Sequence, residues 1–302
     1  MPGSTFQTNP VDLPKVLDDC HRGVIQLPDF QRSWVWDEDR IKSVIASISR
    51  AFPIGALMSL DTGGPVNFKP RPVEGAPTEA RDVVPQSLLL DGQQRMTSLY
   101  QVTLRGKVVE TVTPKKKRVK RWFYIDIRKA LDADTDREEA IIGMPENRIE
   151  HGDFGRAGEL DLSSVEQEYA HLMYPVCQVF DWDSWQDGFD EYWAGDEHKA
   201  VRAAFRTFKK EVLENFKHYR VPVIALDRST SKEAVCVVFE KVNTGGKALD
   251  AFELVTAMYA ASGHELRKDW YGDEKTKGRH RRLVDTLRLA DTEKGILAGV
   301  SN

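Results

Sequence analysis

The sequence of 302 residues predicts an α+β fold, in which a mixed sheet core carries a helical insertion and a helical C-terminal part. Strand-like apolar runs at 54–60 and 87–91 alternate with helical patterns in the first part of the chain. Helical periodicity then dominates from about 130 to 217, and a strand-like run returns at 220–226. Because the chain returns to a strand after the helical stretch, we expect one domain with an insertion rather than two domains.

The segment 25–36 is a short extended run that leads into an amide and a guanidinium, Gln31 and Arg32. Aromatic residues surround this pair, and at least one of them is expected to belong to the core. Asp37 is a typical helix N-cap, and apolar residues recur at i, i+3, i+4 and i+7 from Ile41 to Ile48. This pattern predicts an amphipathic helix that ends before the strand at 54–60.

The run Leu88–Leu99 carries the most informative pattern, because an apolar strand ends in Asp91-Gly92 and a helix follows. A helix N-terminus offers free backbone N–H groups and a positive dipole end, and glycine allows close approach, so this junction suits a phosphate. Arg95 adds a forked cation, and the Asp91 carboxylate is suited to a metal ion or a water. The same residues also fit an ordinary turn with a salt bridge.

The stretch 62–86 is rich in Pro, Gly and charge and is expected to be an exposed loop. After it, the basic string Lys115–Arg121 lies between strand-like runs at 101–109 and 121–127, which predicts a hairpin tip. Such a cluster of cations suits a DNA backbone, and a solvated turn explains it equally well.

The helical stretch has an acidic surface, and its aromatic residues at near-helical spacing, from Trp182 to Trp193, are expected to be core. Further on, a helical apolar stripe from Ala234 to Val242 ends in the glycine-rich loop Asn243–Gly246. This loop fits either a helix–helix connection or a set of ligand-facing N–H groups. The tail from Glu265 to Arg288 is basic and fits either a DNA contact or a solvated helix.

The composition sets bounds on the class of protein. A net charge of −4 argues against a uniformly basic nucleic-acid binder, while it allows local basic patches. The three cysteines are far apart and suggest free thiols. No apolar run approaches the roughly 20 residues that span a bilayer, so we expect a cytoplasmic protein without a membrane partner.

Three segments, Leu27–Trp36, Asp91–Arg95 and Phe239–Gly246, together resemble the N-terminal domain of GmrSD-type, modification-dependent restriction proteins, including SspE-like sensors of phosphorothioate DNA. The resemblance covers about residues 13–261 and implies a core similar to ParB and sulfiredoxin. It implies an NTPase of a bacterial anti-phage restriction system that favours GTP and is stimulated by modified DNA. We therefore expect an NTPase and sensor domain over 1–262 and a basic helical linker over 263–302.

Long members of this family carry a nuclease domain with a His-Asn-His motif, which the seven histidines here do not form. The abrupt ending at Asn302 favours a piece of a longer protein over a stand-alone sensor subunit. The expected partners are nucleotide, modified double-stranded DNA, a nuclease domain in cis or in trans, and a second copy of the chain in a homodimer.

The resemblance and the residue chemistry together assign roles. The expected catalytic residues are Asp91, Arg95, Gln31 and Gln93, and Asp91 is also expected to hold Mg²⁺ while GTP or ATP is the substrate. The expected nucleotide-binding residues are Arg32, Gly92, Gln94, Thr97, Asn243, Thr244, Gly245 and Gly246. The expected DNA-binding residues are Phe30, Trp34, Lys115, Lys116, Lys117, Arg118 and Lys120.

Two other functions use the same phosphate pocket. One is a DNA-binding module that holds a nucleotide as a switch without hydrolysing it. The other is a nuclease that nicks DNA at the Asp91–Arg95 junction. The sequence does not separate these from an NTPase, because each needs a phosphate pocket with a cation.

Overall fold

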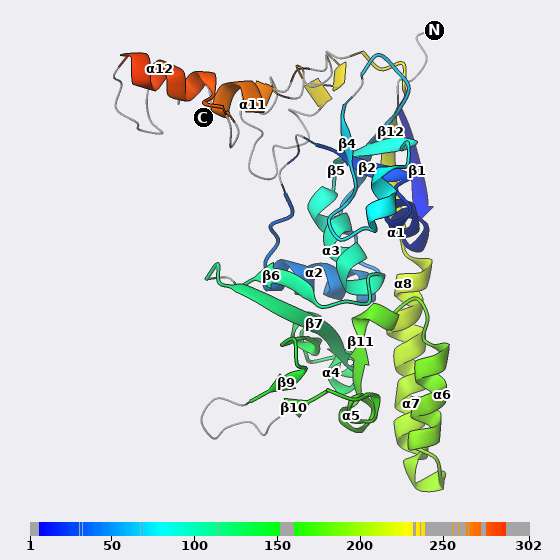
Figure 1. Cartoon of the computed structure of the whole chain (residues 1–302). Coiled ribbons are helices and arrows are strands. Elements are labelled where there is room, and N and C mark those ends of the chain that lie inside the picture. The colour runs from blue at the N-terminus through cyan, green and yellow to red at the C-terminus, as the bar shows by residue number, and fades with distance from the viewer. Residues whose placement is uncertain are drawn as a thin grey trace.

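The protein is described from a computed structural model (Figure 1). The structure describes residues 6–29, 31, 33–66, 68–113, 115–151, 160–231, 234–235, 237–238, 256, 259, 264, 266–272 and 276–287. The chain forms both helices and sheets, and the main sheet is mixed, which confirms the predicted α+β class.

The main sheet has six strands in the order β1-β12-β3-β5-β2-β4. It is mixed, because β2 pairs with β5 and β12 pairs with β3 in parallel while the other pairs are antiparallel. The central strands β3, β5 and β2 are mostly buried, whereas β1 and the short β4 form the two edges and β1 is largely exposed. The bounds are β1 (Phe6–Asp12), β2 (Ile25–Pro28), β3 (Leu57–Asp61), β4 (Pro70–Arg71), β5 (Ser87–Asp91) and β12 (Arg220–Leu226).

Three helices, α1 (Leu13–His21), α2 (Glu38–Ser49) and α3 (Gln93–Thr103), pack together beside this sheet. Asp37 caps α2 as predicted, since its Oδ1 accepts a hydrogen bond of 2.9 Å from the Arg40 backbone N–H. The buried faces of the helices meet through side chains such as Leu13, Ile41 and Leu99, each 0% exposed. Full burial of one such side chain stabilises the fold by about 1.5–3 kcal/mol.

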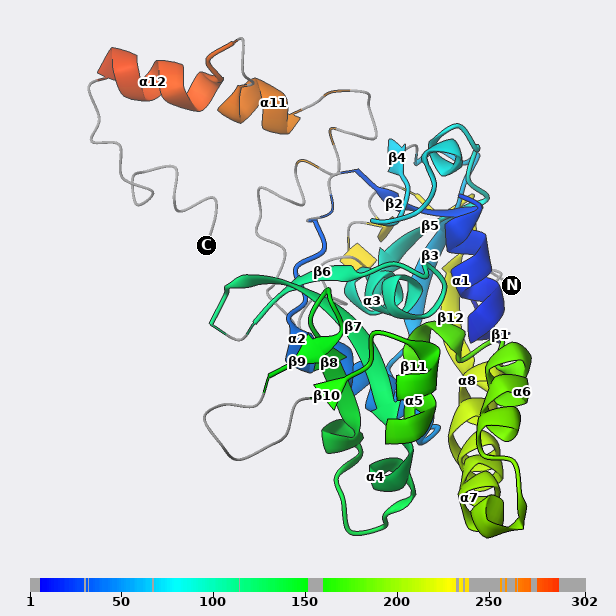
Figure 2. The same cartoon turned by 60° about the horizontal axis from the view of Figure 1, so that its bottom comes forward.

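A second sheet lies below the first in Figure 1 and has the order β11-β7-β6, with β8 also paired to β7. The nine-residue β7 is its longest strand, and its first half forms a hairpin with β6. A separate pair, β9 with β10, lies nearby (Figure 2). The bounds are β6 (Val109–Val112), β7 (Arg118–Asp126), β8 (Ile141–Met144), β9 (Ile149–Glu150), β10 (Leu160–Asp161) and β11 (Met173–Pro175).

Of the remaining helices, α4 and α5 lie beside the second sheet, α6, α7 and α8 form a long arm next to it, and α11 and α12 lie apart from it (Figure 2). Trp182 and Trp185 are buried in this arm, as predicted, whereas Tyr192, also expected in the core, is 45% exposed. The bounds are η1 (Thr78–Arg81), α4 (Ile127–Leu131), η2 (Arg137–Ala140), α5 (Val165–His171), η3 (Val176–Gln178), α6 (Asp183–Tyr192), η4 (Asp196–His198), α7 (Lys199–Phe208), η5 (Lys209–Leu213), α8 (Glu214–His218), α11 (Leu266–Tyr271) and α12 (Arg279–Leu287).

The structure differs from the sequence-based expectation in three places. The predicted strand at 101–109 is wrong, because 101–103 form the last turn of α3 and a strand begins only at Val109. The segment 130–217 contains the short strands β8 to β11 besides its helices. The expected loop at 62–86 buries apolar side chains, including Phe68 and Val73, which are 4% and 2% exposed.

Two smaller observations concern the predictions from composition. Within the described residues, no helix is both long and apolar enough to cross a membrane. Cys20 and Cys177 are free thiols, while Cys236 lies outside the described residues. Burial raises the pKa of the Cys20 thiol to about 12, with a smaller contribution from Asp19, which keeps this thiol protonated at neutral pH.

Candidate functional site

The junction between β5 and α3 has the geometry that the sequence predicts. Gly92 is the N-cap of α3 and has φ +90°, a backbone conformation that favours glycine. A Cβ at this position would lie 2.3 Å from Leu57 Cδ2, so there is also no space for a side chain. The first bond of the helix runs from Met96 N–H to the Gly92 carbonyl, 3.0 Å. The backbone N–H groups of 93–95 therefore precede the helical ladder and lie at its positive end.

The chain that leaves β2 lies beside this junction, because β2 and β5 are parallel neighbours. Gln31 crosses to β5 and donates from Nε2 to the carbonyls of Leu89 and Leu90, at 3.0 and 2.9 Å. Both partners are acceptors, so the amide nitrogen must face them and the orientation of the amide is fixed. Within the described part of the chain, the Gln31 Oε1 atom is buried and has no hydrogen-bond partner. The Gln31 Oε1 atom is thus an unused hydrogen-bond acceptor near the carboxyl end of β5.

Arg95 is tied to the chain segment that enters β3. Its Nη1 donates to the Ile54 carbonyl, and its Nη2 donates to the Ala56 carbonyl at 2.9 Å and to Asp91 Oδ2 at 3.1 Å. A guanidinium has five N–H donors, so these bonds leave about two for a ligand. The side chain is 19% exposed. Gly55 makes room for it, because a Cβ there would lie 2.4 Å from Arg95 Nη1.

Asp91 is the carboxylate at the end of β5, and its side chain is 32% exposed. Its Oδ2 accepts from Arg95, and its other oxygen has no partner among the described residues. The same residues contain no group of three or more His, Cys, Asp or Glu side chains that could hold a metal ion. A single carboxylate fits Mg²⁺, which proteins commonly hold through one or two carboxylates together with substrate phosphates and water.

The other predicted junction residues are more enclosed. Gln93 and Gln94 are 7% and 9% exposed, and Thr97 is fully buried with a hydroxyl that has no partner in the described chain. The Gln94 side chain bonds the backbone of Ser33 and Val35, so what it presents toward the junction is its backbone N–H. The predicted residues Phe30, Arg32, Asn243, Thr244, Gly245 and Gly246 lie outside the described residues.

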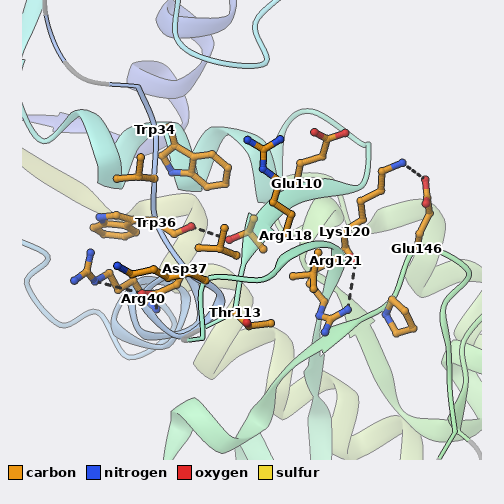
Figure 3. A pocket seen from close by; sticks show the side chains of 16 residues that line it. Trp34, Trp36, Asp37, Arg40, Glu110, Thr113, Arg118, Lys120, Arg121 and Glu146 are labelled. Carbon is orange, nitrogen blue, oxygen red and sulfur yellow. Dashed lines mark hydrogen bonds and ion pairs between the residues drawn. The ribbon is translucent and has the colours of Figure 1, made fainter.

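A cleft of about 1080 Å³ lies between the segment 34–37 and the β6–β7 hairpin (Figure 3). Trp34, Val35 and Trp36 line one wall, and Arg118 and Lys120 of the hairpin line the other. The structure therefore brings the predicted aromatic residue Trp34 and the predicted basic residues of the hairpin into one cleft. The indole ring of Trp34 is fixed to α3, since its Nε1 donates to Ser98 Oγ at 2.9 Å.

The hairpin itself confirms the predicted basic tip. Lys115, Lys116 and Lys117 are exposed and form the turn between β6 and β7. Thr113 closes this turn, because its N–H donates to the Lys117 carbonyl at 2.9 Å and its own carbonyl accepts from Lys116 N–H at 2.7 Å. The tip thus presents adjacent ammonium groups to solvent.

The cationic side chains that line the cleft differ in whether they are already paired with a carboxylate. Lys120 bonds Glu146 at 2.8 Å, and Arg121 bonds Glu38 at 2.9 Å. The bond to Glu146 raises the pKa of Lys120 and so favours the charged ammonium group. The Arg118 side chain is exposed and has no ion pair or hydrogen bond among the described residues. Arg118 is therefore the guanidinium in the cleft with the most donors available to a phosphate.

Sequence reasoning missed Arg71 and Glu74, which lie in the segment expected to be an exposed loop. Glu74 Oε1 accepts from Trp34 N–H at 3.0 Å and from Arg71 Nη1 at 2.9 Å, and Arg71 Nη2 donates to the Gln31 carbonyl at 3.3 Å. The pair, called the Arg71–Glu74 clamp below, therefore holds the backbone at Gln31 and at Trp34. The i, i+3 spacing of the two charges was the available signal, and it does not reveal a partner 40 residues away in sequence.

These features define an α+β domain in which the Gln94 side chain joins a strand–helix junction to a cleft lined by cations and aromatic residues. The chain belongs to the family described as GmrSD restriction endonuclease, N-terminal domain, whose model matches residues 13–260. The match includes both the junction and the cleft.

One relative is the uncharacterized protein MJ0686 of Methanocaldococcus jannaschii, which is 26% identical over 267 residues. The aligned region covers 86% of this chain and 43% of the relative. The chain therefore spans less than half of the length of this relative.

Proposed function

We propose that the chain is a nucleotide-binding and hydrolysing domain, with GTP as the favoured substrate, that senses modified DNA for a bacterial anti-phage restriction system. The observation that carries the proposal is the junction at Gly92, where backbone N–H groups of α3, the Asp91 carboxylate and the fixed Gln31 amide gather at the edges of two parallel strands. In open parallel sheets ligands bind at the carboxyl ends of the strands, and the junction lies at these ends of the parallel pair β2 and β5. The family match supports the restriction context.

In this proposal, the N–H groups of 93–95 hold the terminal phosphates, and the two uncommitted donors of Arg95 neutralise charge that develops on them. The unused Gln31 Oε1 accepts a hydrogen bond from the attacking water and places it for in-line attack. Asp91 would hold Mg²⁺, which when bound supplies positive charge to the phosphate oxygens. The roles of Asp91 and Gln31 each use an oxygen that the fold leaves without a partner among the described residues.

The basic cleft is the proposed DNA surface. Arg118 and the lysines of the tip contact backbone phosphates, while Trp34 and Trp36 contact bases or a modified group. DNA bound there stimulates hydrolysis at the junction. Cleavage of DNA is then the task of a nuclease domain, in cis or in trans.

The test is phosphate release from GTP, ATP and CTP with Mg²⁺, with and without phosphorothioate-containing duplex DNA. Asp91→Asn is the informative variant. The asparagine oxygen still accepts a hydrogen bond from Arg95, but the variant lacks the negative charge of the carboxylate that would bind Mg²⁺. We expect a loss of release of at least about 100-fold with little change in melting temperature. Asp187→Asn, the same change at an exposed position of α6, is the matched control.

Three results would contradict the proposal. Tight nucleotide binding without release indicates the non-hydrolysing switch. Conversion of supercoiled plasmid to the relaxed form, lost in Asp91→Asn, indicates a nickase. Release that is equal in Asp91→Asn and wild type removes the junction from catalysis.

A further inference from the structure

Gln94 lies at the start of α3, yet its side chain points away from the junction to the segment that forms the cleft wall. Its Nε2 donates to the Ser33 carbonyl at 3.3 Å, and its Oε1 accepts from Val35 N–H at 2.9 Å. Both polar ends of the amide are thus used by one backbone segment. Gln94 is 9% exposed, so water does not compete well for these bonds.

The segment that Gln94 holds is the aromatic wall of the cleft. Val35 lines the cleft and is 53% exposed, although its backbone N–H is bound to Gln94. Trp34, beside it, is fixed through Ser98, whose Oγ donates in turn to the Gln94 carbonyl at 2.8 Å. The wall therefore rests on one turn of α3, from 94 to 98.

The same segment is also fixed at Gln31 and Trp34, by the Arg71–Glu74 clamp described above. Between the clamp and α3 the wall has little freedom to move independently of the helix. A shift of the first turn of α3 must therefore shift the positions of Ser33 and Val35 as well.

We infer that Gln94 is a positioning residue of the cleft, which couples occupancy of the α3 N-terminus to the nucleic-acid affinity of the aromatic wall. The inference rests on the proposed function, since it requires a ligand at each place. A ligand that orders the first turn of α3 also orders the wall, and nucleic acid on the wall orders the first turn. By linkage, the factor by which nucleotide changes DNA affinity equals the factor by which DNA changes nucleotide affinity.

For each oligonucleotide, the experiment measures four affinities of the full 302-residue chain. Fluorescence anisotropy gives the Kd of a labelled duplex oligonucleotide, unmodified and phosphorothioate-containing, with and without a non-hydrolysable GTP analogue and Mg²⁺. Titration calorimetry gives the Kd of the analogue with and without the oligonucleotide. We expect a coupling factor of about 5–150 in wild type, equal in both directions.

In Gln94→Ala the N–H of Val35 and the carbonyl of Ser33 lose their partner, so the wall is no longer held by the helix. We expect DNA affinity without nucleotide to fall about tenfold and the coupling factor to approach one. Because the coupling factor is a ratio within one variant, a change in basal nucleotide affinity does not affect it. Gln94→Glu keeps the acceptor for Val35 N–H and loses the donor to Ser33, so an intermediate factor is expected; this variant also serves if Gln94→Ala does not fold.

Gln101→Ala is the matched control, because Gln101 is a glutamine of the same helix, 4% exposed, whose amide accepts from Arg105 and does not touch the wall. It should keep the wild-type coupling factor. A wild-type factor in Gln94→Ala, equal losses in both glutamine variants, or a factor of one in wild type that binds both ligands would each overturn the inference. A wild-type chain that binds neither nucleotide nor DNA would instead overturn the proposed function.

Discussion

Arg95 both stabilises the fold and faces the junction. Its bonds to Ile54, Ala56 and Asp91 join the start of β3 to the first turn of α3, and only the rest of its donors face a ligand. Activity lost on removing this side chain would therefore mix two causes. Substitutions at Asp91 and Gln31 separate the loss of catalysis from the loss of stability better, because each of these side chains has one oxygen without a partner among the described residues.

We predict that Arg95→Ala lowers the free energy of unfolding by about 3 kcal/mol, because two backbone carbonyls and a carboxylate lose a charged donor. Urea denaturation measures this. Arg118→Ala is the control, and it should change stability by less than about 0.5 kcal/mol, because Arg118 is exposed without a partner in the described chain. Equal effects of the two variants would show that the Arg95 bonds do not stabilise the fold.

Gly92 is subject to two constraints, its positive φ and its contact with Leu57. We predict that Gly92→Ala destabilises the fold by more than about 2 kcal/mol, because it combines both costs. Gly63→Ala is the matched comparison, since Gly63 has φ +86° and nothing within 4 Å of an added Cβ. The difference between the two variants in urea denaturation isolates the contact. If Gly63→Ala costs as much, the close approach to Leu57 has no energetic weight.

At the scale of elements, the β6–β7 hairpin places basic residues that are neighbours in sequence along one side of the cleft. Its register places Arg118 opposite Val112, next to the isolated bridge between Val112 and Asp37 that joins hairpin and wall. The charge of the chain as a whole is −4, so DNA affinity at this cleft must come from such local placement.

We predict that Arg118→Glu weakens binding of duplex DNA and reduces the slope of log K against log salt concentration by about one. Arg128→Glu is the control, because Arg128 is an exposed arginine on α4 outside the cleft lining. Anisotropy titrations at several salt concentrations give both slopes. Identical slopes for the two variants would exclude the cleft as the DNA surface.

The sequence predicted the elements that depend on local patterns. The N-cap at Asp37, the strand–turn–helix at Gly92 and the basic hairpin tip each have signals within about ten residues, and all three are confirmed. It could not predict the Arg71–Glu74 clamp or the bonds of Gln94, because these join segments 40 to 61 residues apart. Short strands such as β8 were missed because pairing with β7, rather than their own periodicity, defines them.

At the scale of the whole molecule, a buried carboxylate ties the second sheet to the helical arm. Glu168 of α5 is 4% exposed and accepts from Tyr124 of β7 and Trp185 of α6, both at 3.0 Å. Burial raises the pKa of Glu168, although these two donors and Arg148 lower it in part. The folded state therefore binds this proton more tightly than the unfolded state does.

We predict that the contribution of Glu168 to stability is fully present below its unfolded pKa, near 4.3, and is lost as pH rises through its higher folded pKa. Glu168→Gln should remove this dependence, because glutamine accepts from Trp185 and can donate to the Tyr124 hydroxyl at any pH. Melting temperatures across the acid range measure it. The same pH slope in wild type and variant would assign the effect to other groups.

The central claim is that nucleotide phosphates bind the backbone at the start of α3. Amide hydrogen exchange tests it most directly, measured with and without a non-hydrolysable GTP analogue and Mg²⁺. The account predicts slower exchange at the amides of 92–95, with a smaller effect at Val35, whose N–H is bound to Gln94. Unchanged exchange at 92–95 at saturating analogue, with protection centred on another segment, would contradict it.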